Sequence, residues 1–192
     1  MSIGRQWAVV GGIVAALGAG LWVGVRVAGA DLAQVRVGSL APDFRATTLD
    51  QGARVKTLAD YRGQVVLVNL WATWCGPCVV EMPSIQRLYD RFRESGLKVV
   101  AVAVDDPGFE ERILDFVAER GFTFEILHEG TGTIEATFQT SGIPATFLIG
   151  RDGRIRKLHL GAADWDSAAN RAVVAQLLGV SMDGARATMP TP

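Results

Sequence analysis

A continuous apolar run from Gln64 to Trp71 is the feature that most constrains how this 192-residue chain folds. Its letters, QVVLVNLW, do not alternate between apolar and polar residues, which is typical of a strand buried on both faces of a sheet. The motif Trp74-Cys75-Gly76-Pro77-Cys78 follows almost at once, and a helical pattern begins inside it. We therefore expect a central strand that passes directly into a helix, with both cysteines at the junction.

These two cysteines are the only ones in the chain. Two cysteines with two residues between them, and no further cysteine to form a structural bridge, indicate reversible thiol–disulfide exchange. A disulfide that closes so short a loop stabilises a fold little, because the effect grows with loop length. Two thiolates are also half of a zinc site, but His128 and His159 lie far along the chain, so we expect no metal. Exchange between thiols and disulfides needs no organic cofactor, and we expect none.

The position of each cysteine predicts its role. The sulfur of Cys75 faces the helix N-terminus, where unpaired N–H groups and the helix dipole favour negative charge. Such placement lowers the pKa of a thiol from ~8.5 into the range of ~3.5–7.5, so Cys75 is the expected nucleophile. Cys78 lies one turn further into the helix and is the expected resolving thiol, which attacks the mixed disulfide and releases the substrate.

Alternating helical and strand patterns follow for most of the remaining chain. The first helix is expected over 76–95, where Gly96 is a natural stop. The other expected elements are strands at 98–104 and 123–127, helices at 109–120, 133–139 and 166–178, and a hairpin with strands at 145–149 and 154–160. Helices that alternate with strands and end on a hairpin indicate an α/β fold with a mixed sheet.

The N-terminal segment is apolar enough to enter a membrane. Trp7 to Val25 contains no charged side chain. As a helix with a rise of ~1.5 Å per residue, about 19 residues span roughly 28 Å, close to the ~30 Å of a bilayer core. We favour a retained anchor over a signal peptide cleaved after Ala28-Gly29-Ala30, because the apolar region of a signal is only ~7–15 residues long and Arg26 would lie close to the cut. Both interpretations export the rest of the chain.

The expected organisation has four parts. Residues 1–30 form the anchor or signal segment, 31–36 a linker, 37–180 one domain, and 181–192 a flexible tail. The first thirty residues hold two arginines and no acidic residue, so the exported part is slightly acidic. This charge argues against nucleic acid as a partner.

Three parts of the sequence carry a family resemblance. They are VGSLAPDF with LADYRGQ, VNLWATWCGPCVVEMPSIQRLY, and SGIPATFLIGRDGRI. Together they resemble the membrane-anchored or exported thioredoxin-fold oxidoreductases of the TlpA/ResA type, from about Val37 to Gly179. The resemblance implies a thioredoxin fold, with a central mixed β-sheet flanked by helices, an N-terminal β extension and an inserted βα segment.

The resemblance also implies a substrate-binding surface. It places a cis peptide bond at Ile143-Pro144, beside the two cysteines. Because proline has no N–H and the cis bond turns the chain, the backbone of Ile143 is expected to pair with an extended substrate. The same substrate is expected to contact Trp74, which precedes the first cysteine, and Gly76 and Pro77, which lie between the two cysteines.

Proton transfer is expected to differ from that of cytosolic thioredoxin. There a buried aspartate on the central strand assists the second cysteine, but the matching position here is Asn69, which cannot titrate. Glu81 lies three residues after Cys78 on the same helix face, and ResA-type proteins have a glutamate at that spacing. We expect Glu81 to accept the Cys78 proton; the alternative is a solvated surface carboxylate.

The resemblance implies a thiol–disulfide oxidoreductase that reduces disulfides of exported proteins such as apocytochrome c. The Gly-Pro pair between the cysteines is the pair found in thioredoxin, a reductant with a potential of about −270 mV, whereas the oxidant DsbA has a potential of about −120 mV. The pair therefore favours a reductase. A transmembrane thiol donor of the DsbD/CcdA type is the expected upstream partner. The expected location is the cytoplasmic (inner) membrane, as a single-pass protein with its redox domain on the periplasmic or extracytoplasmic side. A non-catalytic thioredoxin-fold binding module or chaperone of the cell envelope is the alternative.

Overall fold

A computed structural model describes residues 7, 11–20, 22 and 34–182 of the chain. The chain divides into two compact units between Gln34 and Val35, and residues 11–20 of the first unit are helical. Within the described ranges, no helix is both long enough and apolar enough to cross a membrane. The anchor or signal predicted over 1–30 and the tail predicted over 181–192 fall largely outside these ranges, so both stay predictions.

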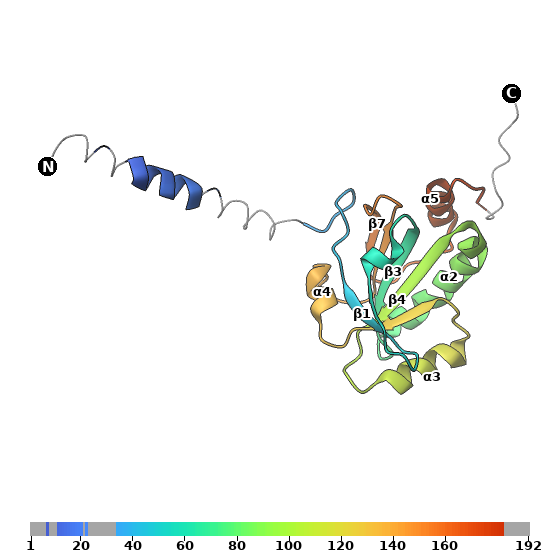
Figure 1. The fold of residues 1–192 in the computed structure, drawn as a ribbon. Coiled ribbons are helices and arrows are strands. Elements are labelled where there is room, and N and C mark those ends of the chain that lie inside the picture. Colours follow the sequence, from blue (N-terminus) through green and yellow to red (C-terminus); the bar gives the residue numbers. More distant parts are fainter. Residues whose placement is uncertain (1–6, 8–10, 21, 23–33, 183–192) are drawn as a thin grey trace, which may run out of the picture. The chain divides into compact units, whose positions relative to one another are not determined.

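In the described part of the second unit, the strands form one seven-stranded mixed sheet with the order β2-β1-β5-β4-β3-β6-β7 (Figure 1). The central strand β3 is parallel to β4 and antiparallel to β6. The strand bounds are β1 Arg45–Thr48, β2 Val55–Thr57, β3 Val65–Trp71, β4 Leu97–Ala103, β5 Glu125–His128, β6 Ala145–Ile149 and β7 Ile155–Leu160.

The helices lie close to their predicted positions. Their bounds are α2 Gly76–Phe92, α3 Glu110–Arg120, α4 Thr133–Thr137 and α5 Ala168–Leu178, with 3-10 turns η1 Leu58–Tyr61 and η2 Arg93–Ser95. The helix predicted over 76–95 is thus α-helical to Phe92 and continues as the 3-10 turn η2. Gly96, with a φ of 101°, ends it as expected, because few residues other than glycine adopt that conformation.

Two additions to the core sheet match the predicted thioredoxin-type architecture. Strands β1 and β2 pair with each other, and β1 also pairs with β5 at the edge of the sheet. They form the N-terminal β extension. Strand β5 and helix α4 come between the first βα unit and the hairpin in the chain, where the resemblance places an insertion.

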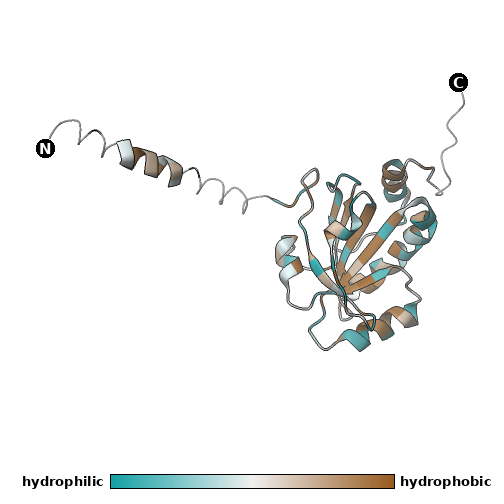
Figure 2. Ribbon diagram, viewed as in Figure 1, coloured by the Kyte–Doolittle hydropathy of each residue, from teal (hydrophilic) through white to brown (hydrophobic). Residues whose placement is uncertain are grey.

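Strand β3 separates two apolar cores, and all seven of its residues are buried. Val65, Leu67 and Trp71 contribute to the core that includes residues of α2, α3 and α5, whereas Val66, Val68 and Leu70 contribute to the core that includes residues of α4. Figure 2 shows the central strands as predominantly hydrophobic, in agreement with burial on both faces. Because side chains alternate along a strand, Asn69 points to the same face as Leu67 and Trp71, beneath α2.

The apolar stripe of α2 holds the first turn of this helix above the end of β3. Met82, Ile85, Leu88 and Phe92 recur at helical spacing, and all four are fully buried. These residues form the inner face of the helix. The packing fixes both the direction of the helix and the place where its N-terminus meets the sheet.

Helix α5 begins two residues later than predicted, at Ala168 rather than Asp166, because Ser167 caps it. The Ser167 hydroxyl accepts a hydrogen bond from the Asn170 N–H at 3.4 Å, and the Ser167 backbone is extended. Ser167→Ala should therefore lower the free energy of unfolding by about 0.5–1 kcal/mol, as measured by urea denaturation of the oxidised protein.

Ser141→Ala is the matched control for this prediction, because Ser141 is an exposed residue of the loop before β6. Its effect should stay within about 0.5 kcal/mol. Equal losses from the two substitutions would show that the Ser167 cap does not stabilise α5.

Candidate active site

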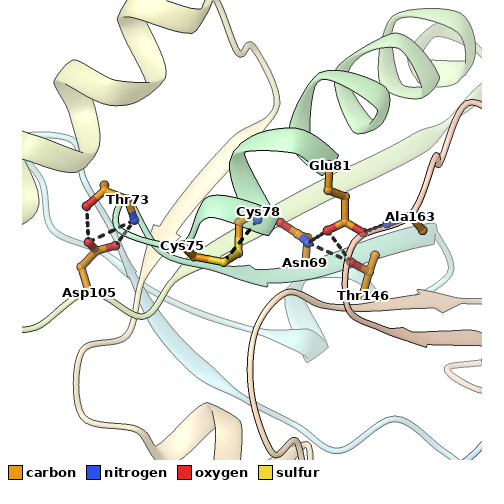
Figure 3. Close-up of a disulfide and its surroundings, with 8 residues drawn as sticks. All are labelled: Asn69, Thr73, Cys75, Cys78, Glu81, Asp105, Thr146 and Ala163. Carbon is orange, nitrogen blue, oxygen red and sulfur yellow. Dashed lines mark hydrogen bonds between the residues drawn. A yellow bond between two sulfur atoms is a disulfide. The ribbon is translucent and has the colours of Figure 1, made fainter.

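The two cysteines form a disulfide at the first turn of α2 (Figure 3). Cys75 is the N-cap residue of the helix, and its sulfur accepts a hydrogen bond from the Cys78 N–H at 3.2 Å. Cys75 is 4% exposed, whereas Cys78 is fully buried. An incoming sulfur therefore reaches Cys75 first, which suits the predicted roles of nucleophile and resolving thiol.

The surface beside the disulfide is partly apolar. Gly76 and Pro77 are exposed, and Trp74 is 64% exposed. Trp71, by contrast, is fully buried, and its ring lies 5.1 Å from that of Phe116. Trp74 is thus available to a substrate, whereas Trp71 packs in the core.

The predicted cis peptide bond is present at Ile143-Pro144. It directly precedes β6, whose first residue, Ala145, pairs with Leu70 near the end of β3. Because β3 leads into the loop that carries Cys75, this register brings the cis-proline and the disulfide to the same edge of the sheet. The backbone carbonyl of Pro144 accepts a hydrogen bond from the Gly161 N–H at 2.8 Å, which ties the turn to the end of β7.

Glu81 is 1% exposed, so the alternative of a solvated surface carboxylate is wrong. Its Oε1 accepts hydrogen bonds from Trp165 Nε1 at 2.8 Å and from the Ala163 N–H at 3.2 Å. Its Oε2 accepts from Asn69 Nδ2 at 3.0 Å and from Thr146 Oγ1 at 3.4 Å. The donors come from β3, β6 and the segment between β7 and α5, so three separate elements enclose the carboxylate.

Burial raises the pKa of the Glu81 carboxyl above its ordinary value, and the four donors offset only part of this rise. A carboxyl with a raised pKa holds a proton more readily, which suits it to exchange a proton with a thiol near neutral pH. Cys78 and Glu81 are three residues apart on α2, so their side chains share one face of the helix. Figure 3 shows Glu81 on the Cys78 side of the disulfide.

Asn69 is a hydrogen-bonded core residue. It is fully buried, pairs with Thr146 in the register of β3 and β6, and donates to Thr146 Oγ1 at 2.8 Å. Its Oδ1 atom has no hydrogen-bond partner within the described residues. Asn69 therefore orients Glu81 from the sheet without titrating itself.

A second buried carboxylate, which sequence reasoning missed, lies on the other side of the disulfide (Figure 3). Asp105 follows β4 and is fully buried. Its two oxygens accept the Thr73 N–H at 3.2 and 3.1 Å, and Oδ1 also accepts the Thr73 hydroxyl at 2.5 Å. These bonds brace the loop that leads to Cys75. An acidic residue directly after an apolar strand was the only signal for this role.

The second missed residue is Trp165, which contacts Glu81 from 84 residues further along the chain. No local pattern around Trp165 indicates that contact. For metals, the described ranges contain no group of three or more His, Cys, Asp or Glu side chains that could hold an ion.

A redox-active cysteine pair at the start of a helix, next to a cis-proline on a thioredoxin-type sheet, defines the class as thiol–disulfide oxidoreductases of the thioredoxin fold. The chain belongs to the Redoxin family, whose model matches residues 36–178. These findings confirm the predicted fold and enzyme class.

Individual relatives agree with this assignment. The thiol-disulfide oxidoreductase ResA of Oceanobacillus iheyensis is 36% identical over 133 residues, which are 68% of this chain and 68% of that protein. ResA of Geobacillus thermodenitrificans is 36% identical over 127 residues, 66% of this chain and 71% of the relative. The structure is also similar to that of a Chlorobium tepidum protein assigned as the thiol:disulfide interchange protein DsbE, with a TM-score of 0.67 and 29% sequence identity. The matched region covers 76% of this chain and 100% of the Chlorobium chain. The resemblance to ResA-type oxidoreductases is thus confirmed.

The raised pKa of Glu81 predicts a pH-dependent stability. Between its ordinary value of 4.5 and its raised value in the fold, the folded protein binds a proton that the unfolded chain has lost. Stability must therefore fall as pH rises through this window. Because Glu81→Gln removes the titration, we expect the free energy of unfolding of the wild type to decline relative to the variant from pH 4.5 upward. The difference should become constant once the carboxyl is ionised in both states.

Urea denaturation of the oxidised protein at a series of pH values measures this difference directly. Two curves that run parallel over the whole range would contradict a raised pKa at Glu81.

Proposed function

We propose that this protein is a reductase, which transfers two electrons from its cysteine pair to disulfides of exported proteins. The observation that carries the proposal is the placement of the fully buried Cys78 one helical turn before a buried carboxylate, with Cys75 at the helix N-cap. This arrangement provides a charge-stabilised nucleophile, a resolving thiol and a base for that thiol.

In the first step, the Cys75 thiolate attacks one sulfur of the substrate disulfide. A mixed disulfide forms, the substrate disulfide breaks, and its other sulfur leaves as a thiolate. The N–H groups at the start of α2 stabilise the attacking thiolate before this step.

In the second step, Cys78 transfers its proton to Glu81 and attacks the Cys75 sulfur. The bond between Cys75 and the substrate breaks, and the second substrate sulfur leaves and takes up the proton that Glu81 received. The enzyme is left with the Cys75–Cys78 disulfide, which is the state of the structure.

The substrate is proposed to bind as an extended segment beside the cis-proline. There the main chain of Ile143 pairs with the substrate backbone, and Trp74, Gly76 and Pro77 contact its side chains. The exposure of Trp74, Gly76 and Pro77 next to the disulfide supports this mode of binding.

The proposed location is the extracytoplasmic side of the cytoplasmic membrane, with residues 1–30 as a retained single-pass anchor. The uncharged run from Trp7 to Val25 supports it. Since each turnover leaves the enzyme oxidised, a donor must reduce it again, and we propose a transmembrane thiol protein of the DsbD/CcdA type. An apocytochrome c, whose haem-attachment thiols must be reduced, or another envelope protein is the proposed substrate.

Substitution of each cysteine distinguishes catalysis from binding. Cys75→Ser should reduce insulin-disulfide reduction to the uncatalysed rate, because the nucleophile is lost. Cys78→Ser should still attack but accumulate mixed disulfides on Cys75, because the resolving thiol is lost. Mass spectrometry of the species trapped in cells then identifies the substrates. Absence of any Cys75-dependent turnover would instead favour the non-catalytic binding module.

The location is tested in cells that produce the full chain. A membrane-impermeant thiol reagent should label the reduced Cys75–Cys78 pair from outside the cytoplasmic membrane, and the chain should stay with membranes after alkaline extraction. Labelling together with release from the membrane would indicate the cleaved signal. Protection of Cys75 in intact cells, together with its labelling once the membrane is opened, would rule out the extracytoplasmic location.

A further inference from the structure

We propose that Trp165 is a positioning residue, which holds the Glu81 carboxylate in place for proton exchange with Cys78. Trp165 is fully buried in the segment between β7 and α5. The 2.8 Å bond from its indole N–H to Oε1 is the shortest of the four hydrogen bonds to this carboxylate. The inference rests on the proposed role of Glu81 and extends it to a residue outside the cysteine motif and the cis-proline loop.

Trp165 is itself held through its backbone by α2 and through its ring by β7. Its backbone N–H donates to the hydroxyl of Ser84, which lies one turn after Glu81 on α2, at 2.9 Å. The ammonium group of Lys157 on β7 lies 5.8 Å from the centroid of the indole ring. That ammonium also donates to the Asn170 side-chain oxygen on α5 at 2.5 Å. The indole N–H therefore points at Glu81 in a fixed direction.

Ion pairs fasten the residues on both sides of Trp165 to α2. Asp164 and Asp166 approach the Arg87 guanidinium at 3.7 and 3.6 Å, and Asp166 also approaches that of Arg91 at 3.5 Å. The arginine side chains remain partly exposed to solvent, so these pairs stabilise a fold little. Their effect here is geometric, because they keep the segment against the helix that carries both Cys78 and Glu81.

The two oxygens of Glu81 are held differently. Oε2 is bound by Asn69 and Thr146 of the sheet, whereas Oε1 is bound by Trp165 and the Ala163 backbone. A donor that points at a carboxylate favours its ionised form. Glu81 must be ionised to accept the Cys78 proton, so the indole N–H helps to set the pH above which the second step proceeds.

Few titratable side chains face this carboxylate. Strands β3 and β6 present only the neutral Asn69 and Thr146. On the other elements packed around it, the titratable side chains are Cys78, three residues earlier on α2, Lys157 and His159 of β7, and Asp164 and Asp166 on either side of Trp165. His159 lies opposite Thr146 in the register of β6 and β7, so its contribution is tested separately from that of Glu81.

Trp165→Phe tests the inference, because it removes the N–H donor and keeps an aromatic ring. The reduced full-length chain is mixed with an aryl disulfide whose released thiolate is coloured. The first thiolate appears when Cys75 attacks, and the second when Cys78 resolves the mixed disulfide. The rate of the second phase should fall toward low pH, where Glu81 is protonated, and this fall is the acid limb of its pH profile. We expect Trp165→Phe to move the acid limb to higher pH by roughly 1 unit, since a hydrogen bond to a charged group is lost. The rate of the first phase should not change.

Matched variants separate this effect from a general loss of packing. Trp71→Phe removes the same group from a fully buried tryptophan whose Nε1 has no hydrogen-bond partner among the residues described, and it should leave the limb in place. His159→Gln should also leave it in place. In a Glu81→Gln background the acid limb should be absent, and Trp165→Phe should then shift nothing further.

The outcomes distinguish the two proposals. If Glu81→Gln keeps the wild-type limb, the proposed proton transfer to Glu81 is wrong. If Glu81→Gln removes the limb but Trp165→Phe leaves it at the wild-type pH, only the positioning role of Trp165 is overturned. A shift that persists in the Glu81→Gln background overturns it as well. If circular dichroism shows that Trp165→Phe is unfolded, benzothienylalanine at position 165, in which sulfur replaces the indole N–H, provides the same test with the ring shape kept.

Discussion

The burial of the Glu81 carboxylate is the constraint that organises the active-site end of this domain. A carboxylate inside an apolar core is tolerated only when donors replace the water that it loses. Four donors converge on Glu81, and they come from β3, β6 and the segment before α5. All of these elements must be in register with α2 for the carboxylate to be accommodated. The buried Cys78 lies one helical turn before Glu81 on α2, so the same packing of α2 on the sheet positions both side chains.

The disulfide lies between two different environments, and this asymmetry gives each sulfur its own role. On one side, Cys75 caps α2 near the surface, and the loop that carries it is braced by Asp105 through Thr73. On the other side, Cys78 is fully buried, three residues before Glu81 on α2. In the proposed mechanism, the helix terminus stabilises the first sulfur as an anion, whereas the second needs a base to become reactive. The proposed division of attack and resolution between the two sulfurs follows from these surroundings.

Local patterns predicted the elements that carry the site. The apolar run became β3, the stripe from Met82 to Phe92 became the inner face of α2, and the hairpin formed where turn residues placed it. Helical spacing also placed Glu81 on the face of Cys78. It did not establish how deeply Glu81 is buried, because that depends on the segment around Trp165. Asp105 and Trp165 were missed because their partners, Thr73 and Glu81, lie 32 and 84 residues away.

The sequence by itself determined the chemistry: one cysteine pair, placed where a doubly buried strand passes into a helix. Hydropathy and spacing act over a few residues, and that range is enough to define a strand, a helix N-terminus and the thiol at its cap. Only the tertiary structure decided the environment of the second thiol. The pKa of Glu81 follows from the water it loses and the donors it gains, and those donors meet only when distant segments are joined by the register of the sheet and the packing of α2.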